Sequence, residues 1–164
     1  MQRLNLMNRF LSIWKSRGME HSARTGIGAA VSLAVARFLG MPEAYWAPIT
    51  TLIVMQSTLG ASWSISKSRF TGTVLGAALG GLLATCFEPG VTMFGLVIFA
   101  LGLICALLRL DQSAYRFAGV TCAIITLVVR GYAPWLIAVH RFIEVSLGIT
   151  VALVFTALWP EQES

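Results

Sequence analysis

The sequence predicts an all-α membrane protein with six transmembrane helices. Only 12% of its 164 residues are charged and 57% are hydrophobic, whereas a soluble domain carries roughly 25% charged residues. From residue 23 to residue 159, apolar runs of the length that crosses a bilayer, about 17–25 residues, follow one another with short gaps. These gaps leave no room for a soluble domain. The predicted spans are residues 20–40, 45–62, 69–87, 91–109, 114–131 and 136–159.

The segment before the first span lacks the apolar centre and the small-residue cleavage site of a signal peptide. Leu4, Met7, Leu11 and Trp14 instead recur at spacings of three and four among basic residues. This pattern favours a short amphipathic helix in the membrane interface, and a frayed cytoplasmic tail is the alternative. The predicted segments are an interfacial helix over residues 1–18, a transmembrane domain over 19–160 and a cytoplasmic tail over 161–164.

The basic residues predict the orientation of the spans. With the N-terminus in the cytoplasm, nine of the twelve Lys and Arg residues lie on the inner side, and Arg37, Arg130 and Arg141 lie on the outer side. This bias follows the positive-inside rule, and six spans return the C-terminus to the cytoplasm. Because the basic residues form no continuous patch, the net charge of +5 reflects membrane topology and predicts no nucleic-acid partner.

The second span carries polar side chains and a proline near its start. Intramembrane proline needs neighbouring polar groups to satisfy the backbone that it disturbs, and Thr50, Thr51 and Gln56 follow Pro48. These side chains either satisfy the backbone locally or line a polar cavity. If they line a cavity, this span contributes Trp46, Thr50 and Gln56 to a substrate site.

The third span contains glycines at a spacing of four residues. Gly72, Gly76 and Gly80 share one helix face, where small residues let a neighbouring backbone approach closely. We expect a packing seam at this face. The alternative is that the same seam slides during transport.

A shift of the sequence by 72 residues aligns scarce residues of the first half with the second. The matched pairs are Arg37 with Arg109, Trp63 with Trp135, and Arg69 with Arg141. Each unit contains three predicted helices, so the second unit crosses the membrane in the opposite sense. Such a 3+3 inverted repeat is common in secondary transporters, whose sites lie at the repeat interface. The alternative is a duplication retained only for packing.

The start of the sixth span holds a charged pair. Glu144 lies about two turns into this span and three residues after Arg141, on the same helix face. A carboxylate at that depth should be paired or protonated. It either neutralises Arg141 structurally or couples transport to protons. Arg69 and Arg141, one near each face of the bundle, are the residues expected to attract an anionic substrate.

No catalytic, metal or cofactor site is predicted. Cys86, Cys105 and Cys122 stand singly within spans, without the spacing of a metal site. There is no Ser/His/Asp set and no phosphate-binding loop, and Gly26-Ile-Gly28 lacks the rest of a nucleotide fingerprint. An enzyme is therefore not expected.

Three motifs carry a resemblance to a known family. They are Tyr45-Trp46-Ala47-x-x-Thr50, then Arg69-x-x-Gly72-Thr73-x-x-Gly76, then Arg141-x-x-Glu144-x-x-x-Gly148. In this order they resemble the fusaric acid resistance and aromatic acid exporter family of bacterial inner-membrane proteins, over residues 22–158. The resemblance implies proton-driven efflux of aromatic carboxylates or related weak-acid toxicants, in some members with a periplasmic adaptor. The long form of that family has two six-span bundles and cytoplasmic domains, so the single bundle here implies that two or more copies associate.

The leading hypothesis is a homo-oligomeric exporter of small organic anions in the bacterial inner membrane. Its partners are the lipid bilayer, a second copy, and an adaptor or another membrane subunit. One alternative is a subunit or scaffold of a larger complex that does not transport. The other is a passive organic-anion channel.

Overall fold

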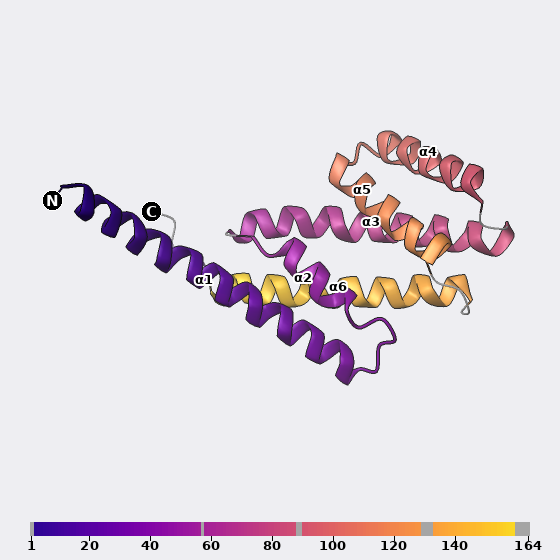
Figure 1. Ribbon diagram of the computed structural model, residues 1–164. Helices are drawn as coiled ribbons and strands as arrows, with labels where there is room; N and C mark the ends of the chain where they lie inside the picture. Colours follow the sequence, from indigo (N-terminus) through magenta and orange to yellow (C-terminus); the bar gives the residue numbers. More distant parts are fainter. Residues whose placement is uncertain (1, 57, 88–89, 129–132, 160–164) are drawn as a thin grey trace.

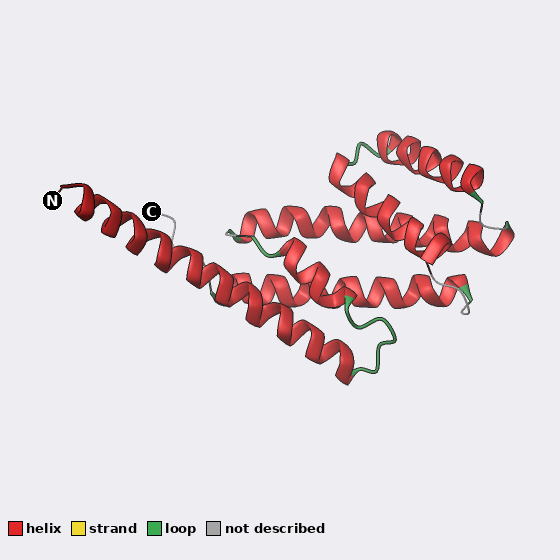
Figure 2. Cartoon of the chain, in the orientation of Figure 1, coloured by secondary structure: helices red, strands yellow, loops and turns green. Residues whose placement is uncertain are grey.

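The computed structural model describes residues 2–56, 58–87, 90–128 and 133–159, with side chains described from residue 19 onward except at residue 128. Within these residues every regular element is helical, so the all-α prediction is confirmed (Figure 2). The helices are α1 (Gln2–Phe38), α2 (Trp46–Val54), α3 (Leu59–Cys86), α4 (Val91–Leu107), α5 (Gln112–Ala123) and α6 (Pro134–Leu158). A π-helical turn (Ile124–Val128) continues α5.

The long helices α3 and α6 lie side by side and run in opposite directions (Figure 1). Helix α5 packs on α3, and α2 packs on α6. Helix α1 contacts α2 and α6, while α4 contacts α5 and, to a lesser extent, α3. By length and composition, α3 and α6 can each cross a membrane, and α4 is a shorter apolar helix.

The predicted boundary between the second and third spans is wrong. Helix α2 ends at Val54, and α3 begins at Leu59, ten residues before the predicted start. The Thr58 hydroxyl caps α3 by accepting a hydrogen bond from the Ala61 backbone N–H at 3.2 Å. A single capping threonine is a weak signal inside a continuous apolar run, because Thr is also common in the middle of membrane helices. The short connection therefore looked like part of one span.

Helix α2 consequently has only nine residues, and at 1.5 Å per residue it extends about 14 Å. The hydrocarbon core of a bilayer is about 30 Å thick, so α2 alone does not cross it. Pro48 is the third residue of α2. The N–H groups of the first turn have no helical partner in any case, so this proline removes no helical hydrogen bond.

The structure shows no break in the helix at the predicted boundary after residue 18. Helix α1 runs without interruption from Gln2 to Phe38. A glycine in a helix costs only about 1 kcal/mol relative to alanine, and no proline precedes residue 42, so Gly18 does not end the helix. The side chains on which the interfacial prediction rests lie outside the described residues, as do residues 161–164 and Arg130.

Helices α1 and α4 end in the same way. The Met41 N–H donates to the Ala36 carbonyl at 3.1 Å, and the Leu110 N–H donates to the Cys105 carbonyl at 2.9 Å. These six-to-one bonds are the mark of a Schellman motif, which needs a left-handed residue. That residue is Gly40 (φ 68°) after α1 and Arg109 (φ 52°) after α4.

Gly40→Ala is expected to lower the free energy of unfolding by about 1 kcal/mol, because a Cβ is unfavourable at positive φ. No heavy atom of the described residues stands within 4 Å of the added Cβ, so we attribute the loss to backbone conformation. Gly60→Ala, in the first turn of α3 with equal space around it, is the control and should not destabilise. Equal thermal stability of both variants in detergent would contradict this explanation.

Candidate functional site

Two buried arginines lie on the neighbouring helices α3 and α6. Arg69 is 4% exposed and Arg141 is 2% exposed. The Arg69 guanidinium carbon lies 4.6 Å from the centre of the Phe117 ring on α5. The Arg141 guanidinium carbon lies 3.5 Å from the centre of the Trp46 ring on α2. Each cation is therefore held against the electron-rich face of an aromatic ring, a contact that strengthens as water is excluded.

Polar groups join the arginines. An Arg69 Nη2–H group donates a long hydrogen bond of 3.5 Å to the Thr50 hydroxyl on α2. The Arg141 Nη1 atom lies 3.8 Å from a carboxylate oxygen of Glu144, which is fully buried. The predicted Arg141–Glu144 pair is thus present in the structure. Since Arg69 on α3 reaches α2, and Arg141 on α6 also reaches α2, the short helix lies between the two cations.

The charges of this cluster do not balance within its buried part. It contains two guanidinium groups and one buried carboxylate. A second carboxylate, the half-buried Glu43 before α2, lies within electrostatic range of both Arg141 and Glu144. Arg141 is also within electrostatic range of Arg69. Among the described residues, the buried part of the cluster therefore has one more basic group than acidic groups, and the half-buried Glu43 is the carboxylate that can offset it.

Several polar atoms of the cluster have no hydrogen-bond partner among the described residues. They are four N–H donors: Arg69 Nε, Arg141 Nε and Nη2, and Trp46 Nε1. Buried polar groups in proteins are nearly always hydrogen-bonded, and buried charges are expensive unless they are paired. The site can therefore donate several hydrogen bonds to a bound polar molecule.

Close helix packing positions these side chains. A Cβ on Gly76 would collide with the Ala118 carbonyl oxygen of α5, and one on Gly148 would collide with the Ala47 carbonyl oxygen of α2. Gly72 and Gly80 also face α5, against Ala114 and Cys122 respectively. The predicted glycine face of α3 is thus the surface that meets α5, and α6 meets α2 in the same manner.

Hydroxyl groups reinforce this packing. The Thr51 hydroxyl lies 3.1 Å from both the Ala47 carbonyl and the Gly148 carbonyl, so it connects α2 to α6. The Thr73 hydroxyl donates to the Arg69 carbonyl at 2.7 Å. Both threonines are fully buried. The helices that carry the two arginines and their aromatic neighbours are therefore closely packed, and hydroxyl groups add hydrogen bonds to this packing.

Gln56 is the predicted site residue that lies apart from the cluster. It follows the C-terminal end of α2, whereas Trp46 begins that helix. Its amide donates to the Ile53 carbonyl at 3.2 Å, and its backbone N–H donates to the Ser62 hydroxyl at 3.0 Å. Its polar groups close the α2–α3 connection, so the structure does not bring it together with the other candidates.

Sequence reasoning missed three residues. Phe117 and Glu43 lie at the cluster, and neither belongs to a recognisable motif. Arg24 is one of the nine basic residues counted on the inner side of the membrane, with no further role predicted, yet its side chain is only 1% exposed. Its spacing could have indicated burial. Small residues follow it at intervals of four, and together they form the buried face of α1: Arg24, Gly28, Ser32 and Ala36.

Comparisons with known proteins identify the family. The family model "Fusaric acid resistance protein-like" matches residues 29–155. The chain is 27% identical over 158 residues to the inner membrane protein YeeA of Escherichia coli strain K12, and the match covers 93% of this chain and 44% of YeeA. It is 32% identical over 139 residues to the uncharacterized transporter YdhK of the same strain, covering 79% of this chain and 21% of YdhK.

The inner membrane protein YccS of that strain is 24% identical over 145 residues, covering 86% of this chain and 20% of YccS. The chain thus spans less than half the length of these relatives. The family model extends over most of the chain and includes both arginines, both aromatic rings, Thr50 and Glu144. The chain therefore belongs to the fusaric acid resistance protein-like family.

Proposed function

We propose that this chain is the membrane-embedded part of a transporter that exports small organic anions across the bacterial inner membrane. The similarity to YdhK, which is named a transporter, and to the inner membrane proteins YeeA and YccS supports this. The apolar surface also supports it, since Phe38, Val91, Leu107 and Leu158 are each more than 80% exposed. Large apolar surfaces of this kind suit a lipid environment rather than water.

The observation that carries the proposal is the pair of buried guanidinium groups, of which only that of Arg141 has a buried carboxylate, Glu144, beside it among the described residues. A guanidinium binds a carboxylate through parallel hydrogen bonds, and Arg69 and Arg141 both retain N–H groups with no partner among the described residues. The Trp46 and Phe117 rings beside them provide flat apolar faces, on which an aromatic substrate would stack. We therefore propose aromatic carboxylates as the substrates.

Glu144 links anion binding to protonation in this proposal. As a carboxylate it lies against Arg141 and competes with the substrate for that cation. When it gains a proton it no longer competes, and the positive charge offered to the anion rises. Intramembrane carboxylates commonly act as proton relays in transporters. Transport is then expected to depend on pH through this one residue.

The arrangement of contacts supports the proposed inverted repeat. Arg69 on Phe117 corresponds to Arg141 on Trp46, and Gly76 against Ala118 corresponds to Gly148 against Ala47. Phe70 and Phe142, which a two-fold relation would exchange, meet each other with ring centres 5.3 Å apart. A rotation that exchanges the halves would bring each arginine onto the site of the other. This is the geometry expected for alternating access.

The corresponding contacts also support a revised alignment of the two halves. An offset of 72 residues relates α3 to α6, as Gly76 and Gly148 do. The offset is 71 for α2 and α5, as for Ala47 and Ala118, and 69 for α1 and α4, as for the Schellman carbonyls of Ala36 and Cys105. Under this alignment Gly40, rather than Arg37, is the counterpart of Arg109.

The association of two copies and the binding of a periplasmic adaptor stay predictions. The oligomeric state of the protein in mild detergent tests whether two copies associate.

The test is uptake of two aromatic anions, benzoate and benzenesulfonate, by proteoliposomes. The sulfonate stays charged throughout, so it does not cross lipid unaided as an acid. Wild-type uptake should rise as the outer solution is acidified, and Glu144→Gln should transport without this pH dependence. Arg141→Gln is expected to reduce uptake at least about tenfold, the effect of losing about 1.4 kcal/mol of binding.

Protein-free liposomes and Arg37→Gln, an exposed arginine on α1, are the controls. If the wild-type protein carried both anions at a rate that did not depend on pH, this would indicate a channel. Absence of flux above the protein-free control would contradict transport and favour the scaffold.

A further inference from the structure

We propose that Arg24 is a latch that closes one end of the bundle, and that the opposite end, where the corresponding described residues make apolar contacts, is the gate that opens more readily. This inference rests on the proposed transport function and on the correspondence between the two halves. It concerns residues that the anion site does not use.

The latch joins the C-terminal ends of two helices. One Arg24 nitrogen donates to the Gln56 carbonyl, just after α2, at 2.8 Å, and another donates to the Trp159 carbonyl, which caps α6, also at 2.8 Å. The carbonyl of Trp159, the C-cap residue of α6, has no helical partner and lies at the negative end of that helix, and the Gln56 carbonyl lies one residue beyond the C-cap of α2. A buried guanidinium on α1 therefore holds α2 and α6 together through charge-assisted hydrogen bonds. His21 Nδ1 lies 3.5 Å from the same guanidinium.

A second set of hydrogen bonds extends the latch to α3. The Ser62 hydroxyl accepts from the Gln56 backbone N–H at 3.0 Å and lies 3.5 Å from the Thr156 hydroxyl of α6. Ser62 and Thr156 are both buried, with at most 1% of their surface exposed. Four helices thus meet at this end through polar groups whose bonds are directional. Any separation of the helices here breaks several of these bonds together.

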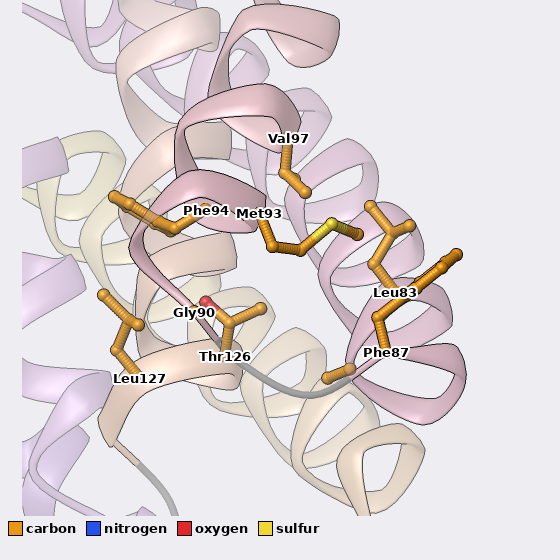
Figure 3. A pocket seen from close by; sticks show the side chains of 9 residues that line it. Leu83, Phe87, Gly90, Met93, Phe94, Val97, Thr126 and Leu127 are labelled. Atoms are coloured by element: carbon orange, nitrogen blue, oxygen red, sulfur yellow. The ribbon is translucent and has the colours of Figure 1, made fainter.

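The corresponding positions at the opposite end are apolar. With the offsets given above, Arg24 corresponds to Met93, Gln56 to Leu127, Thr156 to Ala84 and Trp159 to Phe87. These four residues line a small apolar pocket between the end of α3, the start of α4 and the π-helical turn (Figure 3). The counterpart of Ser62 is Pro134, which has neither a hydroxyl nor a backbone N–H.

The two ends therefore resist opening by different means. Contacts of Met, Phe and Leu are non-directional, and a flexible methionine adapts to displaced neighbours. The pocket among these residues is small, at about 10 Å³, and its lining offers no charged group to hold it closed. Release of the latched end requires a buried guanidinium to leave two carbonyls at once. We expect the apolar end to open while the latch holds, and the latched end to open only after Arg24 is released.

Thiol labelling in proteoliposomes tests this without any substrate. Cys122, which is fully buried beside the α4–α5 core, reports the apolar end, and Ala152→Cys, in the core formed by Val54, Met55, Val145 and Ile149, reports the latched end. Each reporter is used with the other cysteines replaced by alanine. A water-soluble maleimide should label Cys122 faster than the Ala152→Cys thiol. Arg24→Gln should speed labelling of the Ala152→Cys thiol at least about tenfold, which corresponds to about 1.4 kcal/mol, and leave Cys122 unchanged or slower.

Matched variants make the outcome decisive. Met93→Ala should speed labelling of Cys122 alone, and Arg37→Gln should change neither rate. Ser62→Ala, which keeps Arg24, should also speed labelling of the Ala152→Cys thiol, but less than Arg24→Gln does. It replaces Arg24→Gln in the test if that variant does not fold. Equal acceleration at both reporters, or equal rates in the wild type, would overturn the latch. Such a labelling result does not bear on anion uptake, whereas failed uptake with the expected labelling would contradict the proposed transport and leave the difference between the two ends standing.

Discussion

Gly76→Ala and Gly148→Ala are each expected to lower the free energy of unfolding by about 2–3 kcal/mol, the upper part of the range for overpacked interiors. At Gly76 the added Cβ would meet the carbonyl oxygen, carbonyl carbon and Cα of Ala118. At Gly148 it would meet the Ala47 carbonyl and the Thr50 side chain, at 2.7 Å from the Thr50 Cβ. Backbone atoms cannot rotate out of the way, so the helices themselves must separate.

Gly26→Ala is the control for both substitutions. Gly26 lies within α1, and no heavy atom stands within 4 Å of its added Cβ. Alanine is the better helix former by about 1 kcal/mol, so this variant should be at least as stable as the wild type. Thermal unfolding in the same detergent compares the three proteins. If Gly76→Ala unfolded at the temperature of Gly26→Ala, the close approach of α3 and α5 would be wrong.

Removal of Arg141 is the second large effect. Arg141→Gln leaves the fully buried Glu144 without its ion-pair partner, and breaking a buried pair in this way costs about 3–5 kcal/mol. The double variant with Glu144→Gln replaces both charges and should recover most of this loss. Stability measurements on the two single variants and the double variant give the coupling free energy between the residues.

Arg69→Gln provides the comparison within the same site. Arg69 lies on the Phe117 ring and bonds Thr50, so its removal leaves no buried carboxylate unpaired among the described residues. It should cost less stability than Arg141→Gln while still impairing anion uptake. Equal destabilisation by Arg69→Gln and Arg141→Gln, with no recovery in the double variant, would contradict the special pairing of Glu144.

In the proposed transporter, the asymmetry between the two arginines predicts a difference in how each of them binds an anion. The residue three positions after Arg69 is Gly72, which packs against Ala114 and Phe117, whereas the residue three positions after Arg141 is Glu144. In the proposed repeat only one of the two cations therefore has an internal competitor. An anion would bind the two sites with different pH dependence, so a transport step between them would be coupled to protonation on one side.

Sequence reasoning located the charged residues better than it located the helices. Arg141 and Glu144 were expected to pair because three residues along a helix is a fixed, short distance. The end of α2 was missed because it depends on a turn through Gln56, whose groups are satisfied by Ser62 and Arg24. These partners lie elsewhere in the chain, so the local apolar sequence does not predict contacts with them.

The sequence by itself determined the helical class, the membrane-like composition, the glycine face of α3 and the charged pair of α6. All of these follow from composition or from spacing along one helix, which are local properties. Only the tertiary structure decided which ring lies under each arginine, which carbonyl faces each glycine, and that Arg24 bridges Gln56 and Trp159. Arg24 and Trp159 are 135 residues apart, and contacts of that kind depend on how whole helices pack rather than on the order of residues within one.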